Sequence, residues 1–471
     1  MLDMARPRQN QLPAIKDGDQ SQDRCPKLAV PGSTPANTQI RMPTQPEAPG
    51  DRPADAPTNN SPAAAAAHPI GKPERIVSLD VVRGFATLGI LIMNIQFFSM
   101  IGSAYLNPTA YGDLSNSNHW VWYLSHLFAD MKFMSLFSML FGAGIVLISK
   151  KRSTLALPTT SFHFRRMGWL LILGLLHAHL LWPGDILVPY ALCGSAVFWF
   201  RNCSPRLLWT VGVSCFTIAS LISIMTGLSM PFWPPEDILQ LRQESWQPQA
   251  DTIKQEIAAN LQPYFQQLPT RSEQALFMET FLFVFSTMWR CSGLMLIGMA
   301  LYKQRILTGE RSGAVYSALI AIAVCIGIPA TTYGIYRNFE ADWEMSYSLF
   351  LGDQFNYWSS PLISLGYVGG IMLFLKSPIL AKTAWPLARV GQMALSNYLL
   401  QTLLCTFLFY GHGFAQLGKF SRVEQLITVF VVSLVQIAFS CIWLNYFRFG
   451  PLEWLWRSLT YWHRQPLRLQ T

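Results

Sequence analysis

The side chains most able to do chemistry in this sequence lie inside its long apolar runs. Asp130 and Lys132 fall near the middle of one run, and Arg290 near the middle of another. His177 lies at a similar depth in a third run, with His179 slightly further out. An ionisable group inside a bilayer costs at least ~2.5–3.5 kcal/mol on insertion scales, so its presence favours a functional role. Together these groups could move a proton and stabilise a developing negative charge.

A carboxamide pair, Asn397 and Gln401, lies at the same depth, estimated from a rise of ~1.5 Å per residue, and shares one helix face. We predict that this pair, the acid, the two cations and His177 line one central wet chamber. With the histidines neutral, the layer is one charge positive, which suits an anionic ligand. The alternative is a buried ion pair of Asp130 with Arg290 that sets the helix register, with His177 as a packing residue.

A second cluster, Asp80 and Arg83, begins the first apolar run in the segment RIVSLDVVRG. The two residues are i,i+3 neighbours on one helix face and could simply pair with each other. Alternatively, Arg83 binds a cytosolic anion together with the basic residues of the predicted inner segments. These are Lys150, Lys151, Arg152, Arg165 and Arg166.

Polar residues also collect where the runs meet the opposite side of the membrane. They could form an external vestibule or a solvated rim without chemistry, and they are Asn94, Asn107, Asp113, His119, His126 and Asp185. The Cys and His residues do not follow a zinc-type spacing, so no metal site is predicted.

Ten apolar runs must position these groups, because about 18 or more apolar residues can cross a ~30 Å hydrocarbon core. The fourth run is short, and Pro183-Gly184 before it predicts a tight hairpin with the third. The predicted spans are 76–100, 120–148, 166–182, 186–200, 207–230, 276–302, 313–335, 358–376, 388–410 and 423–447.

Charge alternates between the segments that connect these spans. Lys and Arg concentrate in 149–165, 201–206, 303–312 and 377–387. They are absent or outnumbered by acids in 101–119, 183–185, 231–275 and 336–357. The excess of Lys and Arg on cytoplasmic loops therefore places both chain termini in the cytoplasm.

The composition agrees with a membrane protein. Of the 471 residues, 51% are hydrophobic and 13% are charged, against roughly 25% charged in an ordinary soluble chain. The net charge of +9 could suggest a nucleic-acid partner, but the basic residues cluster at span ends, so none is expected. The eight cysteines fall in spans or predicted cytoplasmic segments, which predicts reduced thiols.

The sequence thus predicts an all-α polytopic membrane protein with about ten spans. Its predicted parts are a disordered Pro-rich cytosolic tail over 1–73, a first bundle over 74–230, an external loop over 231–275, a C-terminal transmembrane domain over 276–462 and a cytosolic tail over 463–471. Within the C-terminal domain, GPLEWLWRSLTYW predicts a short amphipathic helix on the cytoplasmic surface. This helix could be an anchor or a substrate gate.

Several motifs together resemble the YeiB-like family of bacterial inner-membrane proteins. They are SLDVVRGFATLGILIMNI, KFMSLFSMLFGAGI and GLLHAHLLWPGDILVPYAL. VGQMALSNYLLQTLLCTFLFY and FGPLEWLWRSLT resemble the domain of unknown function 418 that ends those proteins. The resemblance covers about residues 74–462. It implies a multi-pass protein of the bacterial inner membrane and does not specify a reaction.

The LD-x-x-RG opening of the first span is similar, more distantly, to the transmembrane acyltransferase superfamily. That superfamily includes the lysosomal heparan-glucosaminide acetyltransferase and the acyltransferase-3 group, which use cytosolic acyl-CoA to modify an acceptor across the membrane. The similarity implies that Asp80, Arg83 and Gly84 belong to a shared motif. Asn94 stands where acyltransferase-3 members carry a histidine, so another base is needed here. His119 resembles the histidine of the heparan-type enzyme, although its spacing to the following aspartate differs.

The polar layer and the resemblance favour transfer of an acyl group from cytosolic acyl-CoA, as a co-substrate, to an envelope or lipid-linked acceptor. His119 or His177 would deprotonate the acceptor, and Arg290 or Lys132 would stabilise the oxyanion. The alternatives are a transporter or exporter of an anionic or lipid-like molecule, and a scaffold or sensor in the bilayer. The predicted catalytic residues are His119, Asp130, His177 and Arg290. The predicted ligand contacts are Asp80, Arg83, Asn94, Lys132, Asp185, Asn397 and Gln401.

Overall fold

The computed structural model describes residues 76–469, so the predicted tail over 1–73 lies outside the described residues. Apart from one β-bridge between Phe447 and Arg468, the regular elements of the described part are helices. The predicted all-α polytopic membrane fold is therefore confirmed.

The longer helices follow the predicted spans, and short π and 3-10 segments interrupt or extend them. The α-helices are α2 Val77–Ser99, α3 Ser103–Leu106, α4 Asn116–Phe128, α5 Lys132–Thr154, α6 Thr160–Leu176, α7 Leu187–Val197, α8 Pro205–Ser229, α9 Pro235–Leu241, α10 Ala250–Asn260, α11 Tyr264–Phe277, α12 Met288–Lys303, α13 Gly313–Ile322, α14 Ile328–Glu340, α15 Met345–Tyr347, α16 Asp353–Lys376, α17 Pro378–Thr383, α18 Trp385–Gln392, α19 Ala394–Phe409, α20 Arg422–Tyr446 and α21 Pro451–Tyr461. The π segments are η2 His177–Leu181, η5 Arg242–Trp246, η6 Met278–Thr287, η7 Ala323–Gly327 and η8 Ser348–Gly352, and the 3-10 segments are η3 Phe198–Asn202 and η4 Met230–Phe232.

Among the described residues, seven helical stretches are long and apolar enough to cross a membrane. They cover the first, second, fifth to eighth and tenth predicted spans: Val77–Ser99, Asn116–Thr154, Pro205–Phe232, Tyr264–Lys303, Gly313–Glu340, Met345–Lys376 and Arg422–Tyr446. The ninth predicted span is the shorter apolar helix α19. The third and fourth are a helical hairpin made of α6, η2 and α7.

The second stretch is broken between α4 and α5. α4 ends at Phe128, and Met131, before α5, has a φ of 63°. A non-glycine residue rarely adopts this left-handed conformation. The Asp130 backbone N–H donates to the Ser125 carbonyl at 3.1 Å. Because the helix turns here, Asp130 and Lys132 lie at a break rather than within a continuous helix.

The centre of the bundle joins helices from both halves of the chain. α12 packs against α5 and α8, and α18 packs against α2. A Cβ at Gly142 of α5 would lie 1.9 Å from the Met295 carbonyl oxygen, and a Cβ at Gly298 of α12 would lie 1.9 Å from the Met139 carbonyl oxygen. Such close backbone approach through small residues is typical of helix pairs in membranes. The predicted parts 74–230 and 276–462 therefore share one packed core.

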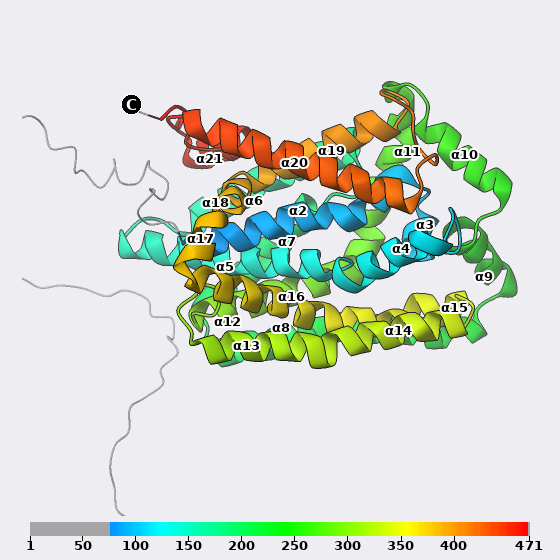
Figure 1. Cartoon of the computed structure of the whole chain (residues 1–471), viewed down its shortest axis with the longest axis horizontal. Helices are drawn as coiled ribbons and strands as arrows, with labels where there is room; N and C mark the ends of the chain where they lie inside the picture. The colour runs from blue at the N-terminus through cyan, green and yellow to red at the C-terminus, as the bar shows by residue number, and fades with distance from the viewer. Residues whose placement is uncertain (1–75, 470–471) are drawn as a thin grey trace, which may run out of the picture. The chain divides into compact units, whose positions relative to one another are not determined.

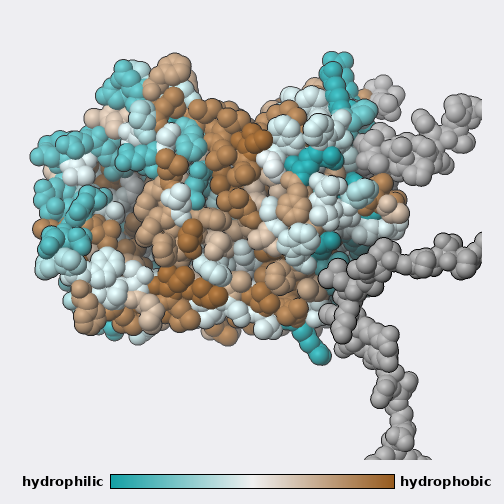
Figure 2. Space-filling view, turned by 180° about the vertical axis from the view of Figure 1, so that it is seen from behind, coloured by the Kyte–Doolittle hydropathy of each residue, from teal (hydrophilic) through white to brown (hydrophobic). Residues whose placement is uncertain are grey.

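The surface between the two ends of the bundle is apolar. Figure 2 shows hydrophobic residues across the middle of one face and hydrophilic residues gathered toward its ends. Large side chains of the spans, such as Leu221, Phe281 and Phe430, are half or more exposed. In water such exposure would be costly, whereas lipid tails solvate it.

The two ends carry different segments (Figure 1). One end has the start of α2, with α17 and α21; following the charge pattern, we call it the inner end. The opposite end has α3, α9, α10 and α15, and we call it the outer end. The connection predicted as a loop over 231–275 is itself mostly helical, with α9, η5, α10 and the first turns of α11.

The predicted amphipathic helix near the C-terminus is α21, and it packs against α6 and α19. The Trp456 indole N–H donates to the Arg166 carbonyl at 2.9 Å, whereas Trp462 is largely exposed. Glu453 is buried and accepts hydrogen bonds from the Leu395 and Ser396 backbone N–H groups. α21 is therefore part of the bundle wall as well as a surface helix.

Candidate functional site

The polar layer predicted from depth divides into separate sites. Asp130, Lys132 and Arg290 lie in one region, toward the outer end. His177 lies apart from them and lines neither of the two cavities described below. The structure therefore corrects the prediction of one shared chamber. Position along a span sets the height of a side chain, but the rotation and packing of the helix decide which neighbours it meets.

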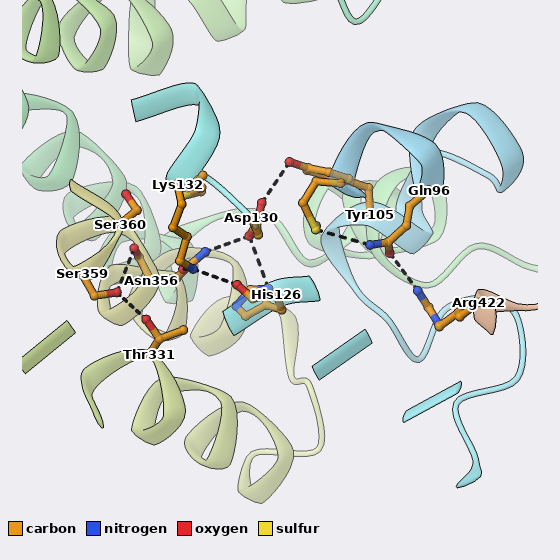
Figure 3. A network of polar contacts seen from close by, with 12 residues as sticks. Gln96, Tyr105, His126, Asp130, Lys132, Thr331, Asn356, Ser359, Ser360 and Arg422 are labelled. Carbon is orange, nitrogen blue, oxygen red and sulfur yellow. Dashed lines mark hydrogen bonds and ion pairs between the residues drawn. The ribbon is translucent and has the colours of Figure 1, made fainter. Parts of the chain in front are cut away.

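Asp130 is the centre of the outer cluster (Figure 3). Its Oδ2 accepts from Asn356 Nδ2 at 2.8 Å and lies 3.3 Å from His126 Nδ1. Its Oδ1 accepts from the Tyr105 hydroxyl at 3.1 Å. Burial and the nearby Asp130 charge raise the pKa of Tyr105 well above its ordinary value, so the phenol remains a donor. Each oxygen of the carboxylate thus accepts a hydrogen bond.

Lys132 is buried beside this carboxylate. Its ammonium donates to the His126 carbonyl at 2.8 Å and to the side-chain oxygen of Asn356. Asn356 therefore bridges the acid and the base. A buried charge without such partners would be strongly unfavourable, so this network stabilises both ions.

Arg290 does not form the ion pair with Asp130 that was the structural alternative. Its guanidinium donates at 3.4 Å to the Met131 carbonyl and at 3.4 Å to the Ser360 hydroxyl. It also lies over the Tyr357 ring, 5.3 Å from the ring centre. Its Nε has no hydrogen-bond partner among the described residues. Arg290 supports the backbone at the break between α4 and α5.

A cavity of about 110 Å³ lies next to Asp130 at the outer end. Four large aromatic side chains line it, and they are Tyr105, Trp122, Trp246 and Trp343. Its other polar lining residues are His126, Asp130, Thr331, Asn338, Ser348, Asp353 and Asn356. We call this space the outer cavity.

A larger cavity, of about 280 Å³, extends from the inner end into the bundle. Asp80 and Arg83 line it, and they also form the predicted local ion pair, at 2.9 Å. Arg166 and Arg457 lie at the same end. Most of the remaining wall is apolar, from residues such as Ile90, Phe137, Leu140, Phe141, Leu147, Leu170 and Leu187. We call this space the inner cavity.

A smaller basic pocket of about 90 Å³ adjoins the inner cavity. Arg166 and Arg457 line both spaces, and Lys151 and Arg152 line the pocket alone. The Arg166 guanidinium lies over the Trp456 ring at 4.4 Å. No carboxylate lines this pocket in the described chain, so its lining is strongly cationic. The predicted phosphate contacts Lys150 and Arg165 line neither space.

His177 sits in a row of hydrogen bonds beyond the deep end of the inner cavity. Its Nδ1 lies 2.8 Å from Asp185 Oδ1, and its Nε2 lies 2.9 Å from Thr402 Oγ1. Asp185 Oδ2 also accepts from the Val188 N–H at 2.7 Å, which holds the carboxylate at the start of α7. The Tyr398 ring lies 5.0 Å from the imidazole ring and lines the inner cavity. Tyr398 thus separates His177 from the cavity.

Asn397 and Gln401 line neither cavity and instead join helices. Asn397 Nδ2 donates to Ser440 Oγ at 2.8 Å. Gln401 Nε2 donates to Gln436 Oε1 at 3.0 Å and to the Thr87 carbonyl at 2.8 Å. These bonds connect α19 with α20 and α2, so the structure assigns this pair a packing role in place of the predicted ligand contact.

The remaining predicted residues lie outside the cavities. His119 is half-buried among aromatic rings at the outer end, 5.6 Å from the Phe339 ring, and Asn94 is half-buried in α2. Asn107 donates to the Trp246 carbonyl at 3.2 Å, and Asp113 accepts from Ser115 N–H at 2.9 Å. The rim is therefore mostly structural, and only His126 joins the outer cluster.

The sequence reasoning missed several residues of these sites. Asp353 and Asn356 begin α16, but their segment was read as an acidic connection because the apolar run starts only at 358. Their i,i+3 spacing was the available signal. Tyr398 and Thr402 are ordinary residues of an apolar span, so only their tertiary neighbours mark them out.

Comparisons with known proteins agree with this architecture. Residues 301–463 match the family model described as "Protein of unknown function (DUF418)". The chain is 35% identical over 396 residues to "Uncharacterized protein YeiB" of Escherichia coli (strain K12), covering 82% of this chain and 96% of the relative. It is 29% identical over 411 residues to "Uncharacterized protein YxaH" of Bacillus subtilis (strain 168), covering 84% and 97%.

Proposed function

The chain belongs to the YeiB-like family of multi-pass membrane proteins with a DUF418 domain, and we propose that its inner cavity binds an acyl-CoA. In this proposal the protein transfers the acyl group to an acceptor in the bacterial inner membrane or envelope. The proposal depends on one observation. At one end of the bundle a cationic pocket adjoins a long apolar cavity, and the two spaces share the lining residues Arg166 and Arg457.

The cationic part suits the phosphates of coenzyme A. Arg166 and Arg457 line both spaces, so one ligand can contact them from the basic pocket and from the cavity mouth. Guanidinium groups bind phosphate through paired charge-assisted hydrogen bonds. Arg83 adds a third guanidinium, with its side chain partly exposed.

The apolar part suits the pantetheine arm and the acyl chain. The cavity runs from Ile76 at the start of α2 past Phe137 to Tyr190 and Tyr398. Its volume of about 280 Å³ is close to the lower end of ordinary ligand pockets, ~300 Å³. An acyl group placed there would bring its thioester toward the wall in front of His177.

His177 is the best-placed base for the transfer. With Asp185 accepting the Nδ1 proton, Nε2 is left to accept a proton from a hydroxyl, and Thr402 Oγ1 lies 2.9 Å from it. In the step, an acceptor hydroxyl oxygen forms a bond to the thioester carbonyl carbon while its proton passes to Nε2. The C–S bond then breaks, and the leaving thiolate takes that proton. Tyr398 must move aside for the acceptor to reach Nε2.

The other candidate bases and oxyanion donors fit less well. His119 lies among aromatic rings at the outer end, and Lys132 and Arg290 belong to the outer cluster, away from the Asp185–His177–Thr402 row beside the inner cavity. We therefore assign the acid–base role to His177 alone and do not assign an oxyanion donor.

Purified protein in nanodiscs provides the test. Titration with CoA and acyl-CoA should show binding that weakens with salt, and acyl-CoA with an acceptor mixture should release thiol. Arg166→Gln should weaken CoA binding about tenfold or more, because hydrogen bonds to charged groups are worth ~1.5–3 kcal/mol. Arg165→Gln, one residue away and outside both spaces, is the matched control. Absence of CoA binding by the wild-type protein would refute the proposal.

The second candidate function is transport, and one specific observation favours it. The inner and outer cavities share no lining residue and lie toward opposite ends of the bundle, and the second span is broken beside one of them. Alternating access uses such discontinuous helices. Uptake of an anionic lipid-like molecule into vesicles without release of CoA thiol would favour this function over acyl transfer.

A further inference from the structure

We propose that Gly144 of α5 is a specificity-determining position of the inner cavity, where the missing side chain lets the elongated tail of a phosphate-headed ligand pass. Gly144 lines that cavity. This role rests on the proposed function, because it takes the basic pocket as the site of the ligand's phosphates. It deepens that function by naming the residue that admits the tail.

One face of α5 forms a wall of the inner cavity. Its lining residues recur with the three- and four-residue spacing of a helix, and they are Phe137, Leu140, Phe141, Gly144, Leu147 and Ile148. This spacing places all six on one stripe of the helix. Five of the six carry a large apolar side chain, so Gly144 leaves a gap in an otherwise continuous apolar wall.

The space in front of Gly144 is open. A Cβ at this position would meet nothing within 4 Å. Gly142 lies on the roughly opposite side of α5, since two residues turn the helix by about 200°. A Cβ there would lie 1.9 Å from the Met295 carbonyl oxygen. Contact with α12 therefore accounts for Gly142 but not for Gly144, and the cavity in front of Gly144 supplies the reason for a small residue.

Gly144 lies about one helical turn from the basic pocket. Ile148, four residues further along α5, lines both the basic pocket and the inner cavity, and Lys151 lines the pocket. At ~1.5 Å per residue, four residues span ~6 Å of the helix. A ligand whose phosphates contact Lys151 and Arg166, and whose tail enters the inner cavity, therefore passes Gly144 once the tail exceeds this length.

The wall beyond Gly144 selects the chemistry of the tail. It is apolar at Leu140, Phe141 and Phe137, and the Phe141 ring packs 5.3 Å from the ring of Tyr190. An elongated apolar tail gains free energy from burial along this wall, whereas a bare phosphate stops at the basic pocket. The ligand class is thus a phosphate head with an elongated tail, which acyl-CoA and a lipid-like phosphate share.

Binding to the Gly144→Leu variant in nanodiscs tests this role. Leucine places its side chain in the passage, while the open space around its Cβ avoids a clash with neighbouring helices. CoA, whose pantetheine arm passes the position, should bind about tenfold or more weakly, the effect of losing burial of roughly two methylene groups. Pyrophosphate, a head without a tail, should bind as it does to the wild type. Gly144→Ala, which adds one carbon, should weaken CoA binding by less than about fourfold.

Gly168→Leu is the matched control. Gly168 is an exposed residue of α6 that lines neither the inner cavity nor the basic pocket, and a Cβ there also meets nothing within 4 Å. This variant should bind CoA as tightly as the wild type. Both leucine variants should unfold at or slightly above the wild-type temperature, because leucine favours helix more than glycine does. That measurement separates a blocked passage from a damaged fold.

Octyl phosphate separates the role of Gly144 from acyl transfer. It has a phosphate head and an apolar tail without the rest of CoA, and its binding is measured relative to empty nanodiscs. If the wild type binds octyl phosphate but not CoA, and Gly144→Leu weakens that binding, the proposed function fails while the role of Gly144 stands. Equal affinity of the wild type and Gly144→Leu for both tailed ligands, or binding of neither to the wild type, would overturn that role. Loss of pyrophosphate binding in Gly144→Leu would overturn it too, because the side chain would then disturb the basic pocket.

Discussion

Asp130 and Lys132, two residues apart at a helix break, are joined through the side-chain amide of Asn356. The amide nitrogen donates to Asp130 Oδ2 at 2.8 Å, and the amide oxygen accepts from the Lys132 ammonium. One uncharged residue of α16 therefore satisfies two buried charges of the α4–α5 span. This contact also connects the break to the wall of the outer cavity.

Replacement of that bridge should be costly. Asn356→Leu keeps a similar volume but removes both hydrogen bonds, so Asp130 and Lys132 each lose a partner in a buried site. We expect a loss of about 3–5 kcal/mol in the free energy of unfolding. Thermal unfolding in nanodiscs measures the effect. Asn202→Leu, at an exposed asparagine of η3, should change stability by less than about 0.5 kcal/mol. Equal stability of the two variants would contradict the bridging role.

The hydrogen bond between His177 and Asp185 predicts that Asp185 positions the imidazole and stabilises its protonated form. Asp185→Asn retains an oxygen for the Val188 N–H but no longer stabilises a protonated imidazole. Acyl transfer should fall about 10²–10⁴-fold, the range for loss of general acid–base catalysis, and its pH profile should change. Glu279→Gln, which alters the partner of the neighbouring His179, serves as control. An unchanged pH profile in Asp185→Asn would argue that the pair is only structural.

The close contact of α5 with α12 predicts that a larger side chain at this contact destabilises the folded protein. Gly298→Ala places a Cβ 1.9 Å from the Met139 carbonyl oxygen, and backbone atoms cannot rotate away. We expect a loss of about 1–3 kcal/mol, measured as a lower unfolding temperature. Gly370→Ala is the control, since a Cβ there meets nothing within 4 Å. That variant should be neutral or slightly stabilising, because alanine favours helix more than glycine does.

Glu453 of α21 predicts a pH effect. Burial raises the pKa of its carboxyl, while hydrogen bonds from Ser396 and Leu395 oppose the shift. A carboxyl with a higher pKa in the folded state contributes stability below the unfolded pKa of ~4.3 and loses it as pH rises through the folded pKa. The unfolding temperature of the wild type minus that of Glu453→Gln should therefore fall as the pH rises from about 4.3 through the pKa of the folded state. The exposed Glu236→Gln should show no comparable trend; a flat difference for Glu453→Gln would reject the assignment.

The sequence by itself determined the class of protein and the course of its helices. Each predicted span became helix, because a run of apolar residues in lipid must satisfy its own backbone hydrogen bonds. The basic segments determined the assignment of the inner end, and the Pro183-Gly184 turn correctly predicted the α6–α7 hairpin. These features depend on local composition and spacing, which a single sequence contains in full.

Tertiary structure alone decided which polar residues meet. Depth placed Asp130, His177 and Gln401 at similar heights, yet the structure puts them in an outer cluster, a histidine row and a helix-joining network. Height is a property of one helix, whereas contact depends on how several helices rotate and pack. For the same reason only the packing of α16 against α5 identifies Asn356 as a partner of Asp130. Likewise, only the packing of α19 against η2 identifies Thr402 as a partner of His177.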